Sequence, residues 1–388
     1  MDVEEVSFEA PSGGTNYHEL KSDDLSVTYS APHWVDANGD GDTLDAGDKN
    51  YPVAFTRNTK PEIGVKFDLG TGLSGQTIKF KATGPGGIAI PPTDLPSSNR
   101  YVTIAPVEST GAFVDTIKHY DSETAGNEFE LSWEMQIGSS GWFSVGETKH
   151  TLYLTLADPE TTLNQETLFT VSCHLSDGES QIPNTLAGVW SEFSDQAVYR
   201  VDGTRITYWA NNNATCTNTE SMIKDGNGQC GAWAEFFIDA LAVHGITDAK
   251  KIYLTPIYQN APDSQIYAGG ESRGLMLVKD WNFSGGSAPI EFSPFTHLPG
   301  EATDQYGSAG QGNGNPPGAF YNHFIVEHGG LYYDPSYGGG VHSSKEAWED
   351  ASLDGFSKVY RVLLGGSPDD LRMFKENSSG VETLFIEQ

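Results

Sequence analysis

The sequence predicts two domains of different fold class: a β-sandwich of immunoglobulin-like type over residues 1–160, followed by an α+β domain over residues 161–388. Two observations carry this prediction. In the first part, apolar residues recur at every second position in short runs, which is the period of half-buried strands. In the second part, one long helical pattern is followed by strand patterns, without the strict alternation of strand and helix that indicates a parallel sheet.

The strands of the first domain are read from its alternating runs. The clearest of them cover residues 77–82, 129–135 and 151–156, and glycine, proline and aspartate residues separate such runs. No segment before about Leu156 keeps a helical period for three turns. We therefore expect a sandwich built from strands, with residues 157–161 as the linker to the second domain.

The strongest helical pattern of the chain lies in the second domain, over residues 229–245, where apolar residues recur every three to four positions. Gly245 is the kind of residue that ends a helix. The glycine-rich segment 307–318 is expected to be a mobile surface loop. Strand-like runs cover residues 168–175, 251–255, 274–279 and 320–327.

The composition disfavours two classes of partner. Among 388 residues, 53 are acidic and 22 are basic, which gives a formal net charge of −31. Such a charge argues against nucleic acid and against anionic membranes as partners. No run approaches the roughly 18 consecutive apolar residues of a membrane-spanning helix, so we expect no membrane insertion. The acidity suits an extracellular or cell-surface protein, although the first residues do not form a secretory signal.

The three cysteines lie in different contexts. Their odd number leaves at least one of them free or paired with another chain. Cys173 in a strand-like run and Cys216 in a polar loop could form a disulfide, and the sequence leaves this open. Cys230 is expected in the first turn of the long helix, where unpaired N–H groups and the helix dipole favour a thiolate. The same N–H groups could stabilise an oxyanion, which favours Cys230 as a nucleophile. The alternative is that Cys230 is a small buried core residue.

A hairpin pattern over residues 322–338 brings a histidine and a carboxylate together. With a two-residue turn, Asp334 lies opposite His323 or diagonal to it, on the same face in both registers. An odd-length turn would separate them. The carboxylate would hold the imidazole while its other nitrogen takes the thiol proton. His244, roughly 20 Å from the cysteine along the helix, and His328, beside the turn, are weaker candidates for the base.

Two blocks of this sequence, Gly228–Phe236 and Asn322–Gly338, resemble the transglutaminase-like branch of the papain-like cysteine enzymes, with Cys, His and Asp in family order. The resemblance covers about residues 165–388. It implies a papain-like, transglutaminase-like fold for this part. It also implies that Cys230 is the nucleophile, His323 the general base and acid, and Asp334 the carboxylate that orients the imidazole.

Family members often place an aromatic residue upstream of the cysteine to stabilise the oxyanion. By this resemblance Trp209 is the nearest candidate here, 21 residues before Cys230. Gln229, directly before the cysteine, is a second candidate for the substrate or oxyanion site. Two histidines apart from His323 compete for the base role, and the long segment between the two blocks prevents any transfer of substrate preference from the family.

A calcium loop is predicted near the N-terminus, because oxygen-bearing side chains recur there at alternate positions around a glycine turn. The expected ligands are Asp36, Asn38, Asp40, Asp42, Asp45 and Asp48. The last ligand falls one residue late, since position twelve of the motif is a glycine. We expect calcium to rigidify this loop and the chemistry to need no cofactor; the alternative is a solvated turn.

The leading hypothesis is a cysteine-dependent acyl-transfer enzyme that acts on peptide or isopeptide amides of a protein substrate through a thioester. Resolution by water would make it a protease or amidase, and resolution by an amine would make it a cross-linking enzyme. The alternative is a calcium-stabilised extracellular binding or adhesion module that has lost catalysis. Its 11% aromatic residues would then recognise carbohydrate or protein. The sequence leaves the substrate and the oligomeric state open.

Overall fold

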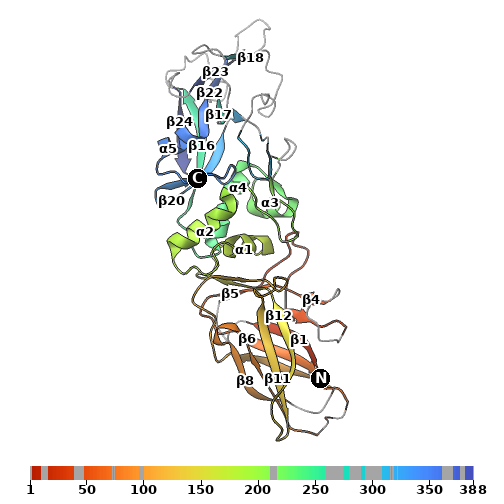
Figure 1. The fold of residues 1–388 in the computed structure, drawn as a ribbon. Coiled ribbons are helices and arrows are strands. Elements are labelled where there is room, and N and C mark those ends of the chain that lie inside the picture. The colour runs from red at the N-terminus through yellow and green to blue at the C-terminus, as the bar shows by residue number, and fades with distance from the viewer. Residues whose placement is uncertain are drawn as a thin grey trace. The chain divides into compact units, whose positions relative to one another are not determined.

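The computed structural model gives a mixed α and β fold, with antiparallel sheets in the N-terminal part and helices later in the chain (Figure 1). This confirms the coarse order of elements that the sequence predicts. The contacts divide the chain into two compact units, residues 1–189 with 240–246 and residues 190–239 with 247–388. The structure describes residues 2–9, 16–38, 48–71, 73, 75–95, 100–209, 216–258, 274–278, 290–292, 308–314, 316, 319–320, 322–360, 370–375 and 381–387.

The described strands of the first unit form three sheets, ordered β4-β3-β1-β6-β9, β10-β13-β5-β2 and β12-β11-β7-β8. Their pairing is antiparallel except between β5 and β13, which run parallel. The bounds are β1 Asp2–Glu9, β2 Tyr17–His18, β3 Trp34–Val35, β4 Lys49–Asn50, β5 Val53–Thr56, β6 Glu62–Asp68, β7 Ile78–Thr83, β8 Ala89–Leu95, β9 Tyr101–Glu108, β10 Lys118–Tyr120, β11 Phe129–Ile137, β12 Phe143–His150 and β13 Leu152–Thr155, with a short 3-10 helix at Pro85–Gly87.

Strand β11 shows why this part of the chain forms sheets. Its alternate residues Phe129, Leu131, Trp133 and Met135 are all buried in one apolar core, while the residues between them are partly exposed. Burial of each such side chain is worth roughly 1.5–3 kcal/mol. The predicted strands at 77–82, 129–135 and 151–156 are therefore confirmed as β7, β11 and β13, within one or two residues at each end.

The prediction of a strand over residues 168–175 is wrong, because helix α1 (Glu166–Cys173) forms there. The carboxylate of Asp23, distant in sequence, accepts hydrogen bonds from the Thr167 N–H at 3.0 Å and the Thr167 hydroxyl at 2.7 Å. It thereby satisfies a first-turn donor of the helix. A short apolar run fits a strand and a buried helix equally well, and this long-range cap is not visible in the local sequence.

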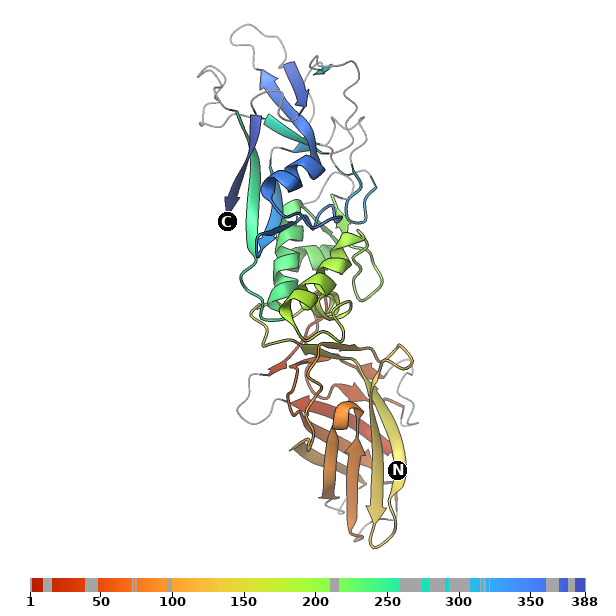
Figure 2. The ribbon, with the colours of Figure 1, turned by 60° about the vertical axis from the view of Figure 1, so that its left-hand side comes forward.

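The described residues of the second unit combine helices with two larger sheets, ordered β21-β20-β16-β24 and β18-β23-β22-β17-β19, and a short parallel pair, β14–β15 (Figure 2). Their bounds, with helix α2, are α2 Ile182–Ser194, α3 Thr219–Asp225, α4 Cys230–Ala242, α5 Lys345–Ser352, β14 Thr207–Tyr208, β15 Asn227–Gly228, β16 Lys250–Tyr258, β17 Gly274–Val278, β18 Ile290–Phe292, β19 Ala319–Phe320, β20 His323–His328, β21 Leu331–Tyr333, β22 Leu353–Tyr360, β23 Asp370–Lys375 and β24 Val381–Glu387. Within the described ranges, no helix is long and apolar enough to span a membrane.

All three cysteines are free thiols, so the Cys173–Cys216 disulfide that the sequence left open is not formed. Cys173 is buried in α1, where its sulfur lies 3.9 Å from the carbonyl oxygen of Leu154, and burial raises the pKa of its thiol. The Cys216 sulfur lies 3.3 Å from a carboxylate oxygen of Asp225. Each of these two sulfurs therefore has a contact of its own other than a second cysteine.

Candidate active site

Cys230 is the first residue of helix α4, as the sequence predicts. Gln229 precedes it and begins the helix: its carbonyl accepts hydrogen bonds from Ala232 at 3.0 Å and Trp233 at 3.1 Å, and its N–H donates to the carbonyl of Cys216 at 3.0 Å. The backbone N–H groups of the first turn lie ahead of the helix's own hydrogen-bond ladder, so they point along the axis toward the cysteine end. The Cys230 side chain is nearly buried, with 6% exposed.

The start of helix α4 packs against strand β20. Lys251 of β16 forms an ion pair with Glu235 of the helix at 3.1 Å and lies 4.9 Å from the ring centroid of Phe324. A Cβ atom placed on Gly231 would lie 3.5 Å from the same ring, an ordinary contact distance. Because Phe324 follows His323 directly, this packing fixes the helix start close to the histidine.

The hairpin of β20 and β21 has the two-residue turn at Gly329 and Gly330, which adopt φ angles of 60° and 83°. Both residues of a type I′ turn need positive φ, which glycine adopts without strain. Val326 pairs with Tyr333, which is the register that leaves Asp334 diagonal to His323 on the same face. This was one of the two registers that kept the pair together, and the prediction of a shared face is confirmed.

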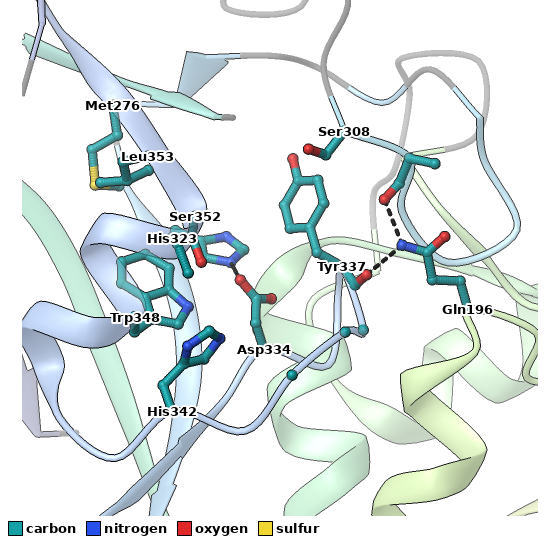
Figure 3. Close-up of a pocket in the computed structure, with 15 residues that line it drawn as sticks. Gln196, Met276, Ser308, His323, Asp334, Tyr337, His342, Trp348, Ser352 and Leu353 are labelled. Carbon is teal, nitrogen blue, oxygen red and sulfur yellow. Dashed lines mark hydrogen bonds and ion pairs between the residues drawn. The ribbon is translucent and has the colours of Figure 1, made fainter. Parts of the chain in front are cut away.

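His323 and Asp334 form a buried hydrogen bond of 2.9 Å between Nε2 and Oδ2 (Figure 3). Their exposed fractions are 3% and 4%. The Cys230 side chain interacts electrostatically with the imidazole. Because Asp334 occupies Nε2, Nδ1 is the ring nitrogen left for the proton of the thiol. The structure therefore brings together the three predicted residues Cys230, His323 and Asp334.

The charge state of His323 follows from these two neighbours. Burial by itself would lower its pKa, but the charge and hydrogen bond of Asp334, together with those of Cys230, raise the pKa to about 10. The imidazole therefore carries its second proton at neutral pH. A protonated imidazole next to a sulfur stabilises negative charge on that sulfur.

The loop after Asp334 is held at several points. The Oδ1 atom of Asp334 accepts a hydrogen bond from the N–H of Ser336 at 3.2 Å, and the backbone carbonyl of Asp334 accepts one from the N–H of Gly338 at 2.9 Å. The preceding residue, Tyr333, packs edge-on against Trp190, with ring centroids 5.1 Å apart. These contacts fix the direction of the carboxylate before it meets the imidazole.

Two aromatic rings lie beside the imidazole and were not predicted as part of the site. Trp348 of helix α5 lies nearly parallel to the His323 ring, at 15° and with centroids 6.2 Å apart, and Tyr337 lies 5.7 Å from it. Tyr337 stands in the Asp-Pro-Ser-Tyr-Gly run that carries the family resemblance, so the sequence offered a signal for it. Trp348 lies 14 residues beyond Asp334, and only the packing of α5 brings it here.

Trp209 lies beside the residues that lead into Cys230. Its N–H donates to the carbonyl of Gly228 at 3.2 Å, and β14 and β15 pair so that Tyr208 faces Gly228. Trp209 has φ of 50°, a left-handed conformation that is strained for this residue type and costs roughly 1–3 kcal/mol. Its indole Nε1 is buried without a hydrogen-bond partner in the described part of the chain. Strain and a spare buried donor at one residue are typical of a functional position.

A side chain at Gly228 would displace Met222. A Cβ atom at this position would lie 2.3 Å from the sulfur of Met222, which is far inside contact distance. The close approach lets β15 run directly from helix α3 into the start of α4. The backbone before Cys230 is therefore set by the residues on both sides of it.

Gln311 links the two halves of the site and contradicts the expectation of a mobile surface loop over 307–318. It is fully buried, and its side-chain Nε2 donates to the carbonyls of Phe193 at 2.6 Å and Pro335 at 3.0 Å. Its backbone carbonyl accepts the N–H of Tyr208 at 2.7 Å, and its N–H donates to Ser336 at 2.9 Å. Residues 308–314 and 316 are described, and the rest of the segment lies outside the described residues.

The two competing histidines have other partners. In the first unit, His244 Nδ1 accepts the N–H of Leu156 at 3.2 Å, and Nε2 lies 2.8 Å from the carbonyl of Ser172. Burial lowers the pKa of His244 to about 4, so the ring is neutral at pH 7. The Nε2 atom of His328 lies 2.9 Å from Asp248 Oδ1.

Three of the six predicted calcium ligands lie in the described residues. The N–H of Ala37 donates to Asp48 Oδ1 at 2.9 Å, and the N–H of Asn38 donates to Asp36 Oδ1 at 3.2 Å. The two ends of the motif therefore meet. Asp48 Oδ2 is buried and has no hydrogen-bond partner in the described chain, which leaves an acceptor that fits a cation. Asp40, Asp42 and Asp45 lie outside the described residues, and the described residues alone contain no group of three metal-ligating side chains.

Chemically, the site combines a thiol at a helix start, a protonated imidazole held by a buried carboxylate, and a spare indole donor nearby. This set can supply a nucleophile, a proton donor and acceptor, and stabilisation of an oxyanion. Comparison with known proteins adds no relative: neither a family model nor a curated protein matches this chain.

Proposed function

We propose that this chain is a cysteine-dependent acyl-transfer enzyme that acts on peptide or isopeptide amides of a protein or peptide substrate, outside the cell or at its surface. One observation carries the proposal. The Cys230 side chain, at the start of helix α4, interacts electrostatically with a buried imidazole whose Nε2 is held by Asp334 at 2.9 Å. A structural cysteine has no need of a charged imidazole beside it.

The finer fold assignment is part of this proposal. A helix that starts with the cysteine, followed by a hairpin that carries the histidine and the aspartate, supports a papain-like, transglutaminase-like fold for the second part of the chain. Antiparallel sheets around one shared apolar core support an immunoglobulin-like sandwich for the first part.

At the start of the reaction the proton of Cys230 is already on His323 Nδ1, and in the first half the Cys230 sulfur attacks the amide carbonyl carbon as a thiolate. The carbonyl oxygen becomes an oxyanion, and we expect spare N–H groups at the start of α4 and the unpartnered Trp209 indole N–H to stabilise it. The carbon–nitrogen bond then breaks. The imidazolium gives its proton to the leaving nitrogen, and an acyl thioester stays on Cys230.

In the second half, water or a primary amine attacks the thioester. His323 takes the proton of the attacking group, the carbon–sulfur bond breaks, and the proton returns to the Cys230–His323 pair. Asp334 keeps the imidazole oriented and its positive charge stabilised through both halves. Water yields a protease or amidase and an amine yields a cross-linking enzyme, and both resolutions use the same residues.

The test is intact-mass spectrometry of wild-type protein and Cys230→Ala after incubation with a labelled primary amine and a glutamine-containing protein such as casein. Amine incorporation that is lost in the variant identifies a transferase. Cysteine-dependent fragments or deamidation without incorporation identify a hydrolase. Products from wild type and variant alike would contradict the proposal, as would an absence of products combined with a Cys230 thiol no more reactive than that of Cys216.

A further inference from the structure

A pocket of about 280 Å³ adjoins the candidate catalytic residues on the side of His323 and Asp334 (Figure 3). Figure 3 shows Trp348 and His342 on one side of the Asp334 carboxylate and Tyr337 on the other. This volume exceeds the roughly 150 Å³ cavity that suffices to bind benzene in an apolar protein interior. The pocket is therefore large enough for an aromatic ring.

The pocket is joined to the nucleophile through two residues. His323 and Tyr337 line it, and both interact electrostatically with Cys230, which itself is not among the lining residues. A group in the pocket thus lies next to the imidazole rather than next to the acyl carbon on the sulfur. In the proposed reaction, the imidazolium hands its proton to the leaving nitrogen. The part of the substrate nearest to the pocket is therefore the substituent on that nitrogen.

The walls of the pocket are mostly apolar. Trp348, Met276 and Leu353 line it and are at most 3% exposed, while the rim at Gly339 and Gly340 is exposed. These glycines carry no side chains that would cover the rim. Desolvation of an aromatic or large aliphatic group in such a pocket is favourable.

The charges in the pocket disfavour a charged group. Among the described residues that line the pocket there is no lysine, arginine or glutamate, and burial lowers the pKa of His342, so this ring adds no charge at neutral pH. The remaining charges are those of Asp334 and the protonated His323, which already pair with each other at 2.9 Å. An incoming carboxylate would meet Asp334, an incoming ammonium would meet the imidazolium, and neither would find a partner of its own.

We propose that this pocket binds an uncharged aromatic or large apolar substituent on the nitrogen of the amide, so that the enzyme selects its substrates on the leaving-group side. This role rests on the acyl-transfer function proposed above. The selectivity of the pocket for an aromatic amide substituent can be measured without turnover.

The experiment measures binding of four small amides to the Cys230→Ala protein by ligand-observed NMR titration. N-Benzylacetamide carries an aromatic group on the nitrogen, N-methylacetamide a small group, N-acetylglycine a carboxylate, and N-(2-aminoethyl)acetamide an ammonium. N-Benzylacetamide should bind at least about tenfold more tightly than each of the other three. Equal affinity for all four, or a preference for either charged amide, would overturn the proposal.

Two substitutions at the pocket locate the binding. Gly340→Leu is tolerated by the backbone, because Gly340 has no positive φ and nothing lies within 4 Å of an added Cβ. Ala351→Trp fills the pocket from helix α5. At least one of them should weaken N-benzylacetamide binding about tenfold or more. Gly141→Leu, at an equally open glycine with ordinary φ in the first unit, should leave it unchanged. Binding that both pocket variants leave intact would overturn the proposal.

The alkylation rate of Cys230 in wild-type protein separates failure of the pocket from failure of the function. A reactive Cys230 without selective amide binding removes the pocket proposal and keeps the enzyme. Selective binding beside an unreactive Cys230 removes the pocket's role on the leaving-group side, and with it the acyl-transfer function.

Discussion

Buried histidines in the two units of this chain have opposite protonation behaviour. In the first unit, His150 is fully buried against the Thr148 hydroxyl at 2.9 Å, and burial lowers its pKa to about 3. His33 is similar, with a pKa of about 4. In the second unit, His323 is equally buried but hydrogen-bonded to the Asp334 carboxylate, and its pKa rises to about 10. Burial keeps the first two rings neutral, whereas a buried carboxylate makes the third a cation.

This difference separates a core histidine from the histidine that we propose to be catalytic. A neutral ring such as His150 contributes packing and one hydrogen bond to its sheet. A ring of the second kind beside a cysteine can hold the proton of the thiol and hand it to a leaving group, which is the task of the general base and acid in acyl transfer. Removal of the carboxylate should therefore turn the catalytic histidine into a ring of the first kind.

Asp334→Asn is the substitution with the largest expected effect. It keeps the size of the side chain, removes the charge, and can hold the imidazole in the wrong tautomer. We expect kcat to fall about 10³- to 10⁴-fold, as for the aspartate of comparable triads. Initial rates of amine incorporation or peptide cleavage measure it.

Asp248→Asn is the matched control for that substitution. Asp248 also hydrogen-bonds a histidine, His328, at 2.9 Å, but this carboxylate is exposed and its histidine has no cysteine beside it. Its loss should leave kcat within about twofold, because exposed ion pairs contribute little. Equal losses in the two variants would contradict the role given to Asp334.

Trp209→Phe should have the next largest effect, since it removes the indole N–H and keeps the ring. Loss of one oxyanion donor typically lowers kcat about 10²- to 10³-fold, and we expect little change in KM. Trp142→Phe is the control, because Trp142 is a half-buried tryptophan of the first unit. An unchanged kcat in Trp209→Phe would remove this residue from the oxyanion site.

The pH dependence of stability should differ for the two kinds of histidine. The folded pKa of His323 lies above the unfolded value of about 6.5. Its stabilisation is therefore fully present below pH 6.5 and is lost as the pH rises toward about 10. The folded pKa of His150 lies below 6.5, so the folded state loses stability as the pH falls from 6.5 toward about 3.

Urea unfolding at pH 5, 7 and 9 measures the free energy of unfolding on the acid limb, between pH 7 and 5, and on the alkaline limb, between pH 7 and 9. His323→Gln should flatten the alkaline limb between pH 7 and 9, and His150→Gln should flatten the acid limb between pH 7 and 5. If His323→Gln leaves the alkaline slope as steep as in the wild type, the raised pKa of His323 is contradicted.

Calcium should give the smallest effect and act on the first unit alone. We expect millimolar calcium to raise the melting temperature by a few degrees, since a ligand that binds only the folded state stabilises it, and to leave kcat unchanged. Asp48→Asn should abolish the shift, because the buried Asp48 Oδ2 has no other partner in the described chain. A melting temperature that does not respond to calcium would count against the site.

The sequence could predict the parts of the fold that local patterns determine. Alternation in β11 and the cysteine at the start of α4 are local, and the two glycines after His328 indicate a two-residue turn, which keeps His323 and Asp334 on one face. The three catalytic candidates therefore came from residues within two short blocks.

The rest depends on contacts between distant residues. Helix α1 is capped by Asp23, which lies more than 140 positions earlier in the sequence. Gln311 is buried where its side-chain amide donates hydrogen bonds to the carbonyls of Phe193 and Pro335. A run of glycines and asparagines around Gln311 gives no sign of this. Trp348 and the pocket likewise exist because helix α5 packs beside β20 and β22, which no local pattern encodes.

The most direct test of the central claim is the rate at which iodoacetamide modifies Cys230 and Cys216 at pH 6.5, followed by peptide mass spectrometry. Both side chains are 6% exposed, so access is matched, and only Cys230 lies beside a protonated imidazole. We predict that Cys230 reacts at least about tenfold faster, and that Asp334→Asn removes most of this advantage. Equal rates for the two cysteines in the wild-type protein would contradict the claim that His323 and Asp334 activate Cys230.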